Sequence, residues 1–395
     1  MASNTRKMSA FIRRAEGAIL RRMIKLARRV AGPAIQRILI EERQTPQQLA
    51  GSPVVRSGDS ETLQRIAKVL VANSGNGKPD MSTEAVSLEL ARLIAPKLAA
   101  MPGNPGHGIF YPHGLHLLPK HFYLPIPDDG DQLDTFWTTP SKMVGVEMNS
   151  ASQLMLIKDV LPRHLAEFRK RFPITEAKAK GEFYLLNGSY MAVDAHVYYS
   201  LIREIKPKRI VEIGTGYSTI LACQAGRLNK EQYGRSPVIT AIDPYPWEVF
   251  KDGLAGLNEV VPKKVQDVPL DVFTSLEAGD ILFIDSTHAL RSGSDVQYEF
   301  LEILPRLAPG VLVHVHDVSL PLPYPKVYYD TQTYWNEQYL LQAFLAHNSR
   351  FEVVWAGNYM LINHPDVVLE TFPEFRLMKD KWTSSEPTAF WIRSK

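Results

Sequence analysis

RIVEIGTGYST, residues 209–219, decides the fold that this sequence predicts. Its first five residues, 209–213, are a short apolar run rich in β-branched side chains, which is typical of a buried strand. Gly214 and Gly216 follow directly, and glycine is needed where a backbone takes positive φ or approaches a ligand closely. A helical pattern then begins at Ser218. The segment therefore predicts a strand, a sharp turn and a helix, which is where doubly wound α/β sheets bind their ligands.

The alternation of short apolar runs and helical patterns continues on both sides of this segment. The expected strands are 209–213, 237–242, 280–284 and 311–315, and the expected helices are 150–171, 192–205, 217–228, 295–307 and 335–347. Such alternation predicts an α/β, Rossmann-like, doubly wound and mostly parallel sheet with helices on both faces. FEVVW (351–355) and YMLI (359–362) flank Gly357-Asn358, which predicts an antiparallel C-terminal hairpin at the sheet edge.

Changes in composition divide the chain into four expected parts. Residues 101–140 are dense in Pro, Gly, His and aromatic residues, which is typical of a long functional loop. The expected parts are a basic amphipathic helical head (1–45), an accessory or lid region (46–179), the Rossmann-like domain (180–365) and a C-terminal extension (366–395).

Composition and charge exclude several classes of protein. Of the 395 residues, 45% are hydrophobic and 22% are charged, as in a globular protein with a sizeable core. No apolar run approaches 18 residues, so the sequence predicts no membrane-spanning helix. A single cysteine, Cys223, excludes an internal disulfide and a cysteine-rich zinc module, and it favours a cytoplasmic location.

The basic charge is confined to the head. Residues 1–45 hold 11 Lys and Arg against three acids, a net charge of +8, and the rest of the chain is at −5. A nucleic-acid-binding body is therefore not expected. Three readings of the head stay open: a solvated helix on the body, peripheral membrane contact through residues 6–30, and a transit peptide.

Acidic residues at two strand ends indicate the ligand of the glycine turn. Glu212 precedes Gly214 by two residues, and a carboxylate there suits a ligand with positive charge rather than a diphosphate. Asp243 ends the next strand, where an acid can accept hydrogen bonds from both ribose hydroxyls. A dinucleotide fingerprint would need a third glycine at position 219, where this chain has Thr219. The set favours a nucleoside ligand and argues against NAD.

Two further strands each end in an acid near an imidazole. Asp285 ends the strand at 280–284 and is followed by His288, and Asp317 stands beside His316 after the strand at 311–315. Oxygen-rich pairs of this kind suit a hard divalent cation, while an imidazole can act as a base near neutral pH. Asp285, His288 and Asp317 are therefore the catalytic candidates, with Asp285 and Asp317 as candidate metal ligands. His314 is expected inside the sheet.

EIGTGYST, AID, FIDSTH and HVHD, taken together, resemble the motifs of class I S-adenosylmethionine-dependent methyltransferases, and most closely the type 24 family. The resemblance covers about residues 180–365. It implies S-adenosylmethionine as cofactor and Mg²⁺ or another divalent cation as a second one. The implied contacts are Glu212, Gly214, Gly216 and Ser218 for the methionine part, Asp243 for the ribose, Gln266-Asp267 for the adenine, and Asp285 and Asp317 for the cation.

The resemblance implies O-methylation of a small hydroxylated molecule, a sugar or a secondary metabolite. Metal-dependent members usually follow the second Asp with Asn or Asp, but Val318 follows Asp317 here, which leaves two clear carboxylate ligands. Two alternatives stay open: an NAD-dependent oxidoreductase, and a catalytically silent Rossmann-like module that acts as a membrane-associated partner.

Aromatic residues after the last acidic motif are candidates for the acceptor pocket. Tyr324, Tyr328, Tyr329 and Trp335 could line it, or could equally form a packing patch. The segment 335–345 predicts the start of a core-facing helix in which Glu337 has a structural role.

Overall fold

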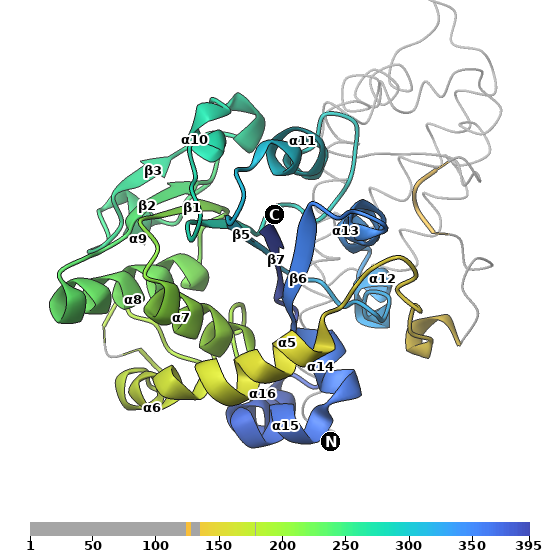
Figure 1. Ribbon diagram of the computed structural model, residues 1–395, viewed down its shortest axis with the longest axis horizontal. Helices are drawn as coiled ribbons and strands as arrows, with labels where there is room; N and C mark the ends of the chain where they lie inside the picture. Colours follow the sequence, from red (N-terminus) through yellow and green to blue (C-terminus); the bar gives the residue numbers. More distant parts are fainter. Residues whose placement is uncertain (1–123, 128–134, 178) are drawn as a thin grey trace, which may run out of the picture. The chain divides into compact units, whose positions relative to one another are not determined.

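A seven-stranded sheet with the order β3-β2-β1-β4-β5-β7-β6 organises the fold of the computed structural model. The strands are β1 (Arg209–Ile213), β2 (Val238–Ile242), β3 (Glu259–Val261), β4 (Ile281–Ile284), β5 (Leu312–Val315), β6 (Phe351–Ala356) and β7 (Phe390–Ser394). The first five pair in parallel, and β7 pairs antiparallel with both β5 and β6. The α/β fold with a mostly parallel, doubly wound sheet is therefore confirmed (Figure 1).

The structure describes residues 124–127, 135–177 and 179–395, and residues 126–395 form a compact unit of their own. The expected helical head, its membrane contact through residues 6–30 and most of the expected accessory region lie outside the described residues. Within the part that is described, no helix is both long and apolar enough to span a membrane.

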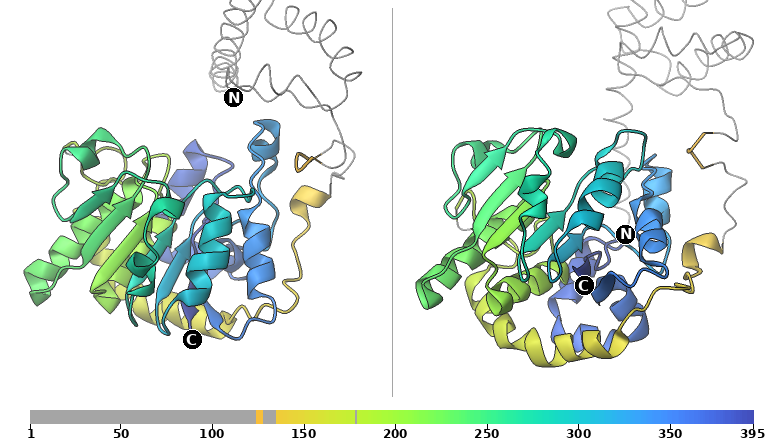
Figure 2. Two further views of the ribbon diagram at one scale, coloured as in Figure 1. Left: turned by 90° about the horizontal axis from the view of Figure 1, so that it is seen from above. Right: turned by 45° about the horizontal axis from the view of Figure 1, so that its top comes forward.

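Helices cover both faces of the sheet, as Figures 1 and 2 show. On one face pack α5 (Ser150–Met155), α6 (Pro162–Arg171), α7 (Asp194–Ile205), α8 (Tyr217–Tyr233), α14 (Gly357–Asn363), α15 (Pro365–Thr371) and α16 (Glu374–Lys381). On the other face pack α10 (Asp271–Thr274), α11 (Asp295–Tyr298) and α13 (Glu337–Leu345). Two shorter helices, α9 (Glu248–Lys251) and α12 (Lys326–Asp330), lie in loops after β2 and β5.

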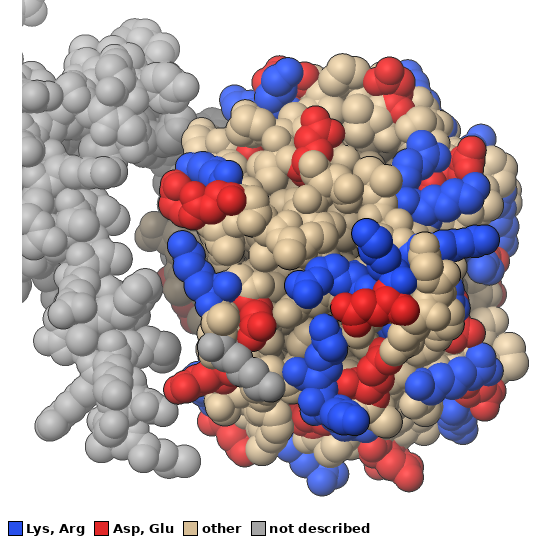
Figure 3. Space-filling view, turned by 90° about the vertical axis from the view of Figure 1, so that its left-hand side faces the viewer, with Lys and Arg blue, Asp and Glu red and all other residues tan. Residues whose placement is uncertain are grey.

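The two apolar cores follow from the alternation of side chains along each strand. In β4, Ile281 and Phe283 belong to the core under α7 and α8, while Leu282 and Ile284 belong to the core under α11 and α13. All four side chains are fully buried, which explains why the parallel strands read as continuous apolar runs. On the face around α8, α9 and β3, basic and acidic side chains are interspersed (Figure 3).

The C-terminal part of the sheet differs from the prediction. Residues 359–362 lie in helix α14, not in a strand, and the antiparallel partner of β6 is β7. An apolar run of four residues fits a buried helix as well as a strand, so periodicity alone could not decide between them. β7 lies in the segment expected to be a C-terminal extension, yet it is inserted between β5 and β6, so the sheet extends beyond residue 365.

Candidate functional site at the carboxyl ends of the parallel strands

The register of the parallel strands brings the predicted site residues to one edge of the sheet. Ile213 pairs with Ile242 on one side and with Ile284 on the other, and Ile284 pairs with Val315. The residues that follow these four strand ends therefore lie along a single rim. This is the edge at which open α/β sheets bind ligands.

The two glycines of the turn are required for different reasons. Gly214 has φ +96°, and a Cβ there would lie 2.2 Å from the carbonyl oxygen of Asp285, so the packing of the turn itself requires a glycine. Its amide donates to the carbonyl of Ile242 at 2.9 Å, which ties the turn to β2. Gly216 is extended, and a Cβ there would meet no atom of the described part of the chain within 4 Å. The open space at Gly216 is thus available to a ligand.

Glu212 is a fully buried carboxyl below this turn. Its Oε1 accepts hydrogen bonds from the hydroxyls of Ser218 at 2.5 Å and Thr219 at 3.0 Å. Its Oε2 is buried and has no hydrogen-bond partner among the residues that the structure describes. Burial raises the pKa of Glu212 to about 8, although the hydrogen bonds from the Ser218 and Thr219 hydroxyls lower it in part. Ser218 therefore supports Glu212 from the first turn of α8.

Asp243 is fixed at the end of β2 by the glycine turn and by its own loop. Its Oδ2 accepts a hydrogen bond from the Thr215 hydroxyl at 2.5 Å, and its Oδ1 accepts one from the Tyr245 amide at 2.7 Å. Asp267 is exposed at the end of a 3₁₀ turn after β3. Its neighbour Gln266 donates to the carbonyl of Gly293, so this turn is tied to the loop after β4.

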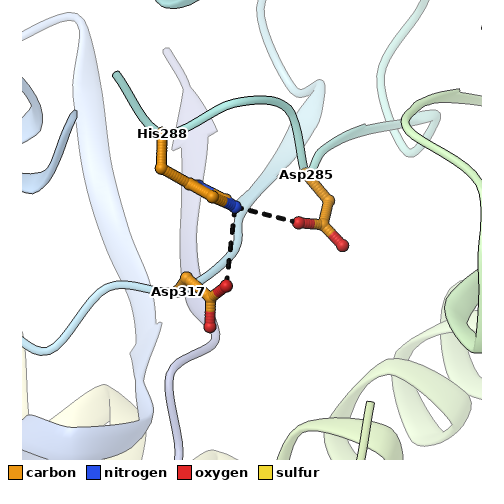
Figure 4. A group of neighbouring side chains, drawn as sticks. All are labelled: Asp285, His288 and Asp317. Atoms are coloured by element: carbon orange, nitrogen blue, oxygen red, sulfur yellow. Dashed lines mark ion pairs between the residues drawn. The ribbon is translucent and has the colours of Figure 1, made fainter. Parts of the chain in front are cut away.

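Asp285, His288 and Asp317 come together at the ends of β4 and β5 (Figure 4). The His288 Nε2 lies 3.2 Å from Asp285 Oδ1 and 3.5 Å from Asp317 Oδ2. One nitrogen or oxygen atom from each residue lies within 4.8 Å of the other two, a spacing suited to holding a metal ion. His288 and Asp317 both have positive φ, which is uncommon outside glycine and concentrates at functional sites.

The charges of the cluster are interdependent. Burial alone would lower the pKa of His288, but hydrogen bonds to Asp285 and Glu337 and the nearby carboxylates raise it well above its usual value. Burial would raise the pKa of Asp285, but the electrostatic interactions with His316 and His288 and the hydrogen bond to His288 outweigh burial and lower the pKa. The cluster thus stabilises positive charge between its carboxylates.

Three residues at this rim were not predicted as site residues: Glu337, for which only a structural role was expected, and Thr388 and Asp194. Glu337, at the start of α13, is fully buried, and its Oε2 lies 2.7 Å from His288 Nδ1. The Thr388 hydroxyl lies 3.3 Å from Asp317 Oδ1 and 3.2 Å from Asp194 Oδ2. Neither Glu337 nor Thr388 is close to the acidic motifs in the sequence. No local pattern signals such contacts.

The other two histidines of β5 and its end lie behind the cluster. His314 is fully buried, stacks on Phe283 at 4.0 Å between ring centroids, and has its pKa held well below its usual value by burial. Its Nε2 lies 3.2 Å from Nδ1 of His316, whose Nε2 is 3.8 Å from Asp317 Oδ1. The prediction of His314 as a core residue is confirmed.

Most of the predicted aromatic residues form a wall beside the cluster. The Trp335 ring lies 4.4 Å from that of His288 and 4.8 Å from that of Tyr328, measured between centroids. Tyr324 lies 5.9 Å from Trp335 and is buried. Tyr329 instead packs against Trp137 at 5.8 Å and belongs to a different patch.

The comparison with known proteins identifies the family. The type 24 family, described as a methyltransferase domain, matches residues 211–318, which include the glycine turn, Asp243, Asp285 and Asp317. The chain belongs to this methyltransferase family. An uncharacterized protein of Archaeoglobus fulgidus is 32% identical to this chain over 167 residues. The matched region covers 40% of this chain and 73% of the archaeal protein. No solved structure gives a significant match.

Membership of this family implies S-adenosylmethionine as the methyl donor, and the described residues fit that cofactor. The space that a Cβ at Gly216 would fill is open, so a ligand can approach the backbone there. The unpaired Oε2 of Glu212 is a buried acceptor below the same turn. A cationic ligand would satisfy it, whereas NAD would bring its diphosphate to this position, so the methyltransferase assignment replaces the oxidoreductase alternative.

Proposed function

We propose that this methyltransferase transfers a methyl group from S-adenosylmethionine to a hydroxyl of a small molecule, a sugar or a secondary metabolite, with the help of a divalent cation. The observation that carries the proposal is the convergence of Asp285, His288 and Asp317 on the rim that also holds the glycine turn. Asp285 and Asp317 would hold the cation. Glu212, Gly214, Gly216, Ser218, Asp243 and Asp267 would serve the cofactor.

A hydroxyl acceptor explains why basic groups gather beside the cofactor turn. In methyl transfer to oxygen, a C–O bond forms as the S–CH₃ bond breaks, and the electron pair of the broken bond returns to sulfur. The hydroxyl proton must also leave, and Asp285, His288 and Asp317 offer basic atoms to receive it. A bound divalent cation would lower the pKa of the acceptor hydroxyl.

The aromatic wall supports a small cyclic acceptor. Trp335 lies against His288, and Tyr328 lies against Trp335. Both aromatic rings are partly exposed, so a ring of the acceptor could lie against them at the cluster. The protein's main contribution would be alignment, because the methyl group of a sulfonium is already activated. Orientation of the acceptor therefore matters more than a strong base.

The test has two stages. Titration calorimetry first measures S-adenosylmethionine binding to the wild type, to Glu212→Gln and to Asp317→Asn. The protein is then incubated with methyl-labelled cofactor and a panel of sugars and phenols, with Mg²⁺ or Mn²⁺ or with a chelator. Mass spectrometry and NMR locate the methyl group. Asp271→Asn, at an exposed aspartate of α10, is the matched control.

We expect Glu212→Gln to weaken cofactor binding by about 10-fold or more, the equivalent of one charge-assisted hydrogen bond. Asp317→Asn should bind the cofactor normally but form no methyl ether, and the chelator should have the same effect. Labelled product with the methyl on nitrogen or carbon would contradict O-methylation. If the wild type bound no S-adenosylmethionine, the result would favour the alternative of a catalytically silent Rossmann-like module.

A further inference from the structure

Glu337 is placed to orient the ring of His288. Its side chain is fully buried, and its Oε2 lies 2.7 Å from His288 Nδ1, the closest of the ring's three carboxylate contacts. The amides of Asn336 and Glu337 also donate to the carbonyl oxygen of His288 at 3.0 and 3.2 Å. Both the backbone and the ring of His288 are therefore held by the start of α13.

This contact settles which ring nitrogen faces the rim. A carboxylate can only accept, so His288 Nδ1 carries the hydrogen of the short contact with Glu337. The Nε2 then points between Asp285 and Asp317 (Figure 4), at distances of 3.2 and 3.5 Å. Two ligands at right angles on one cation are about 3 Å apart when each bond is about 2.1 Å. The three side chains thus have the spacing of a shared ligand set.

We infer that His288 is the third protein ligand of the cation, through Nε2, and that Glu337 is the positioning residue that fixes its tautomer and orientation. The inference rests on the cation-assisted function proposed above, and it gives His288 a ligand role in place of that of a general base. Histidine ligands commonly donate their second nitrogen to a carboxylate, as His288 does to Glu337.

The donor set also selects the class of cation. Two carboxylates with one imidazole suit a divalent first-row transition ion better than Mg²⁺ or Ca²⁺, which prefer oxygen ligands alone, and Mn²⁺ is the member of that row that serves as a paramagnetic probe. This third ligand makes up for Val318, which stands where other metal-dependent members have Asn or Asp. The cluster is therefore complete without an additional side chain at position 318.

His316 is the competing imidazole, and its geometry is poorer. Its Nδ1 faces another imidazole, that of His314, at 3.2 Å, and its Nε2 is 3.8 Å from Asp317 Oδ1. Glu299 offers a matched control for Glu337, because it is also fully buried but accepts its hydrogen bond from the Ser286 hydroxyl, at 3.0 Å, and not from His288.

The experiment uses the full chain and Mn²⁺ as the probe. Electron paramagnetic resonance titration gives the Mn²⁺ affinity, and electron spin echo modulation detects a ¹⁴N nucleus bonded directly to the ion. The variants are His288→Ala, Glu337→Ala, Glu337→Gln, Glu337→Met, His316→Ala and Glu299→Gln, with circular dichroism and S-adenosylmethionine binding as checks on folding.

We expect ¹⁴N modulation in the wild type, in His316→Ala and in Glu299→Gln, and its loss in His288→Ala. Glu337→Ala should weaken Mn²⁺ binding about 10- to 100-fold, the usual cost of losing such an outer partner. Glu337→Gln should recover part of this loss, because an amide oxygen can still accept from Nδ1. Glu337→Met, which fills a similar volume but cannot accept a hydrogen bond, should not recover it, and equal recovery by Met and Gln would show that Glu337 merely fills space in the core.

The contrary results separate the two proposals. Tight Mn²⁺ binding without ¹⁴N modulation would overturn the ligand role of His288 and leave cation-assisted O-methylation standing. If the ¹⁴N modulation disappeared in His316→Ala and not in His288→Ala, the ligand would be His316, and the ligand role of His288 would be overturned. A wild type that binds S-adenosylmethionine but no Mn²⁺ would overturn both the inference and the cation in the proposed function, while leaving the methyltransferase assignment intact.

Discussion

The two halves of the rim are built in different ways. The half at β1 and β2 is local: Glu212 is held by Ser218 and Thr219 within eight residues of sequence, and Gly214 and Gly216 lie between them. The half at β4 and β5 is assembled from segments that are far apart in the sequence. His288 contacts Asp317, which follows β5, and Glu337, which lies in α13. The local half can be read from a motif. The other half depends on how distant elements pack.

The largest expected effect separates the two glycines of the local half. Gly214→Ala should destabilise the protein by about 3 kcal/mol or more, because the new Cβ meets the Asp285 carbonyl and φ is positive. Gly216→Ala should change the free energy of unfolding by less than about 1 kcal/mol but weaken S-adenosylmethionine binding. Urea unfolding and titration calorimetry measure the two quantities. Equal destabilisation by both variants would show that Gly216 also serves internal packing.

A smaller effect is expected in the pH dependence of cofactor binding. The pKa of Glu212 is about 8, so without ligand its carboxyl is mostly neutral below that pH. A positively charged ligand prefers the ionised form, so affinity should rise with pH up to about 8 and level off above it, by at most about 10-fold per unit. The ratio of wild-type to Glu212→Gln affinities isolates this effect from the titration of the cofactor's own amino group. A ratio independent of pH between 6 and 9 would contradict the prediction.

The smallest effect tests the assembled half. Thr388→Val removes a hydroxyl close to both Asp317 and Asp194 while keeping the shape of the side chain. One hydrogen bond contributes about 1 kcal/mol, so Mn²⁺ affinity should fall about 5-fold. Affinity for S-adenosylmethionine should stay the same, because Thr388 does not contact the glycine turn. If the variant weakened cofactor binding equally, the two halves would be coupled rather than separate.

Four of the five parallel strands, β1, β2, β4 and β5, could be predicted because most of their residues are buried on both faces of the sheet. β4 is an unbroken apolar run and β1 is apolar except for Arg209 and Glu212, and the acids at the strand ends are part of the sequence motifs. β7 could not be predicted in the same way. Its place between β5 and β6 depends on pairing partners about 35 and 75 residues away, and β-structure is decided more by such context than by local propensity.

The sequence by itself determined the four parallel strands β1, β2, β4 and β5, the glycine turn with Glu212 and Asp243, and the three side chains Asp285, His288 and Asp317. Parallel pairing brings the carboxyl ends of the strands to one edge of the sheet. Residues that directly follow these strands in the sequence can therefore be predicted to lie close together. Only the tertiary structure decided that Glu337 orients His288 and that Thr388 lies against Asp317. Those contacts join segments far apart in the chain, and their geometry depends on how α13 and β7 pack against the sheet.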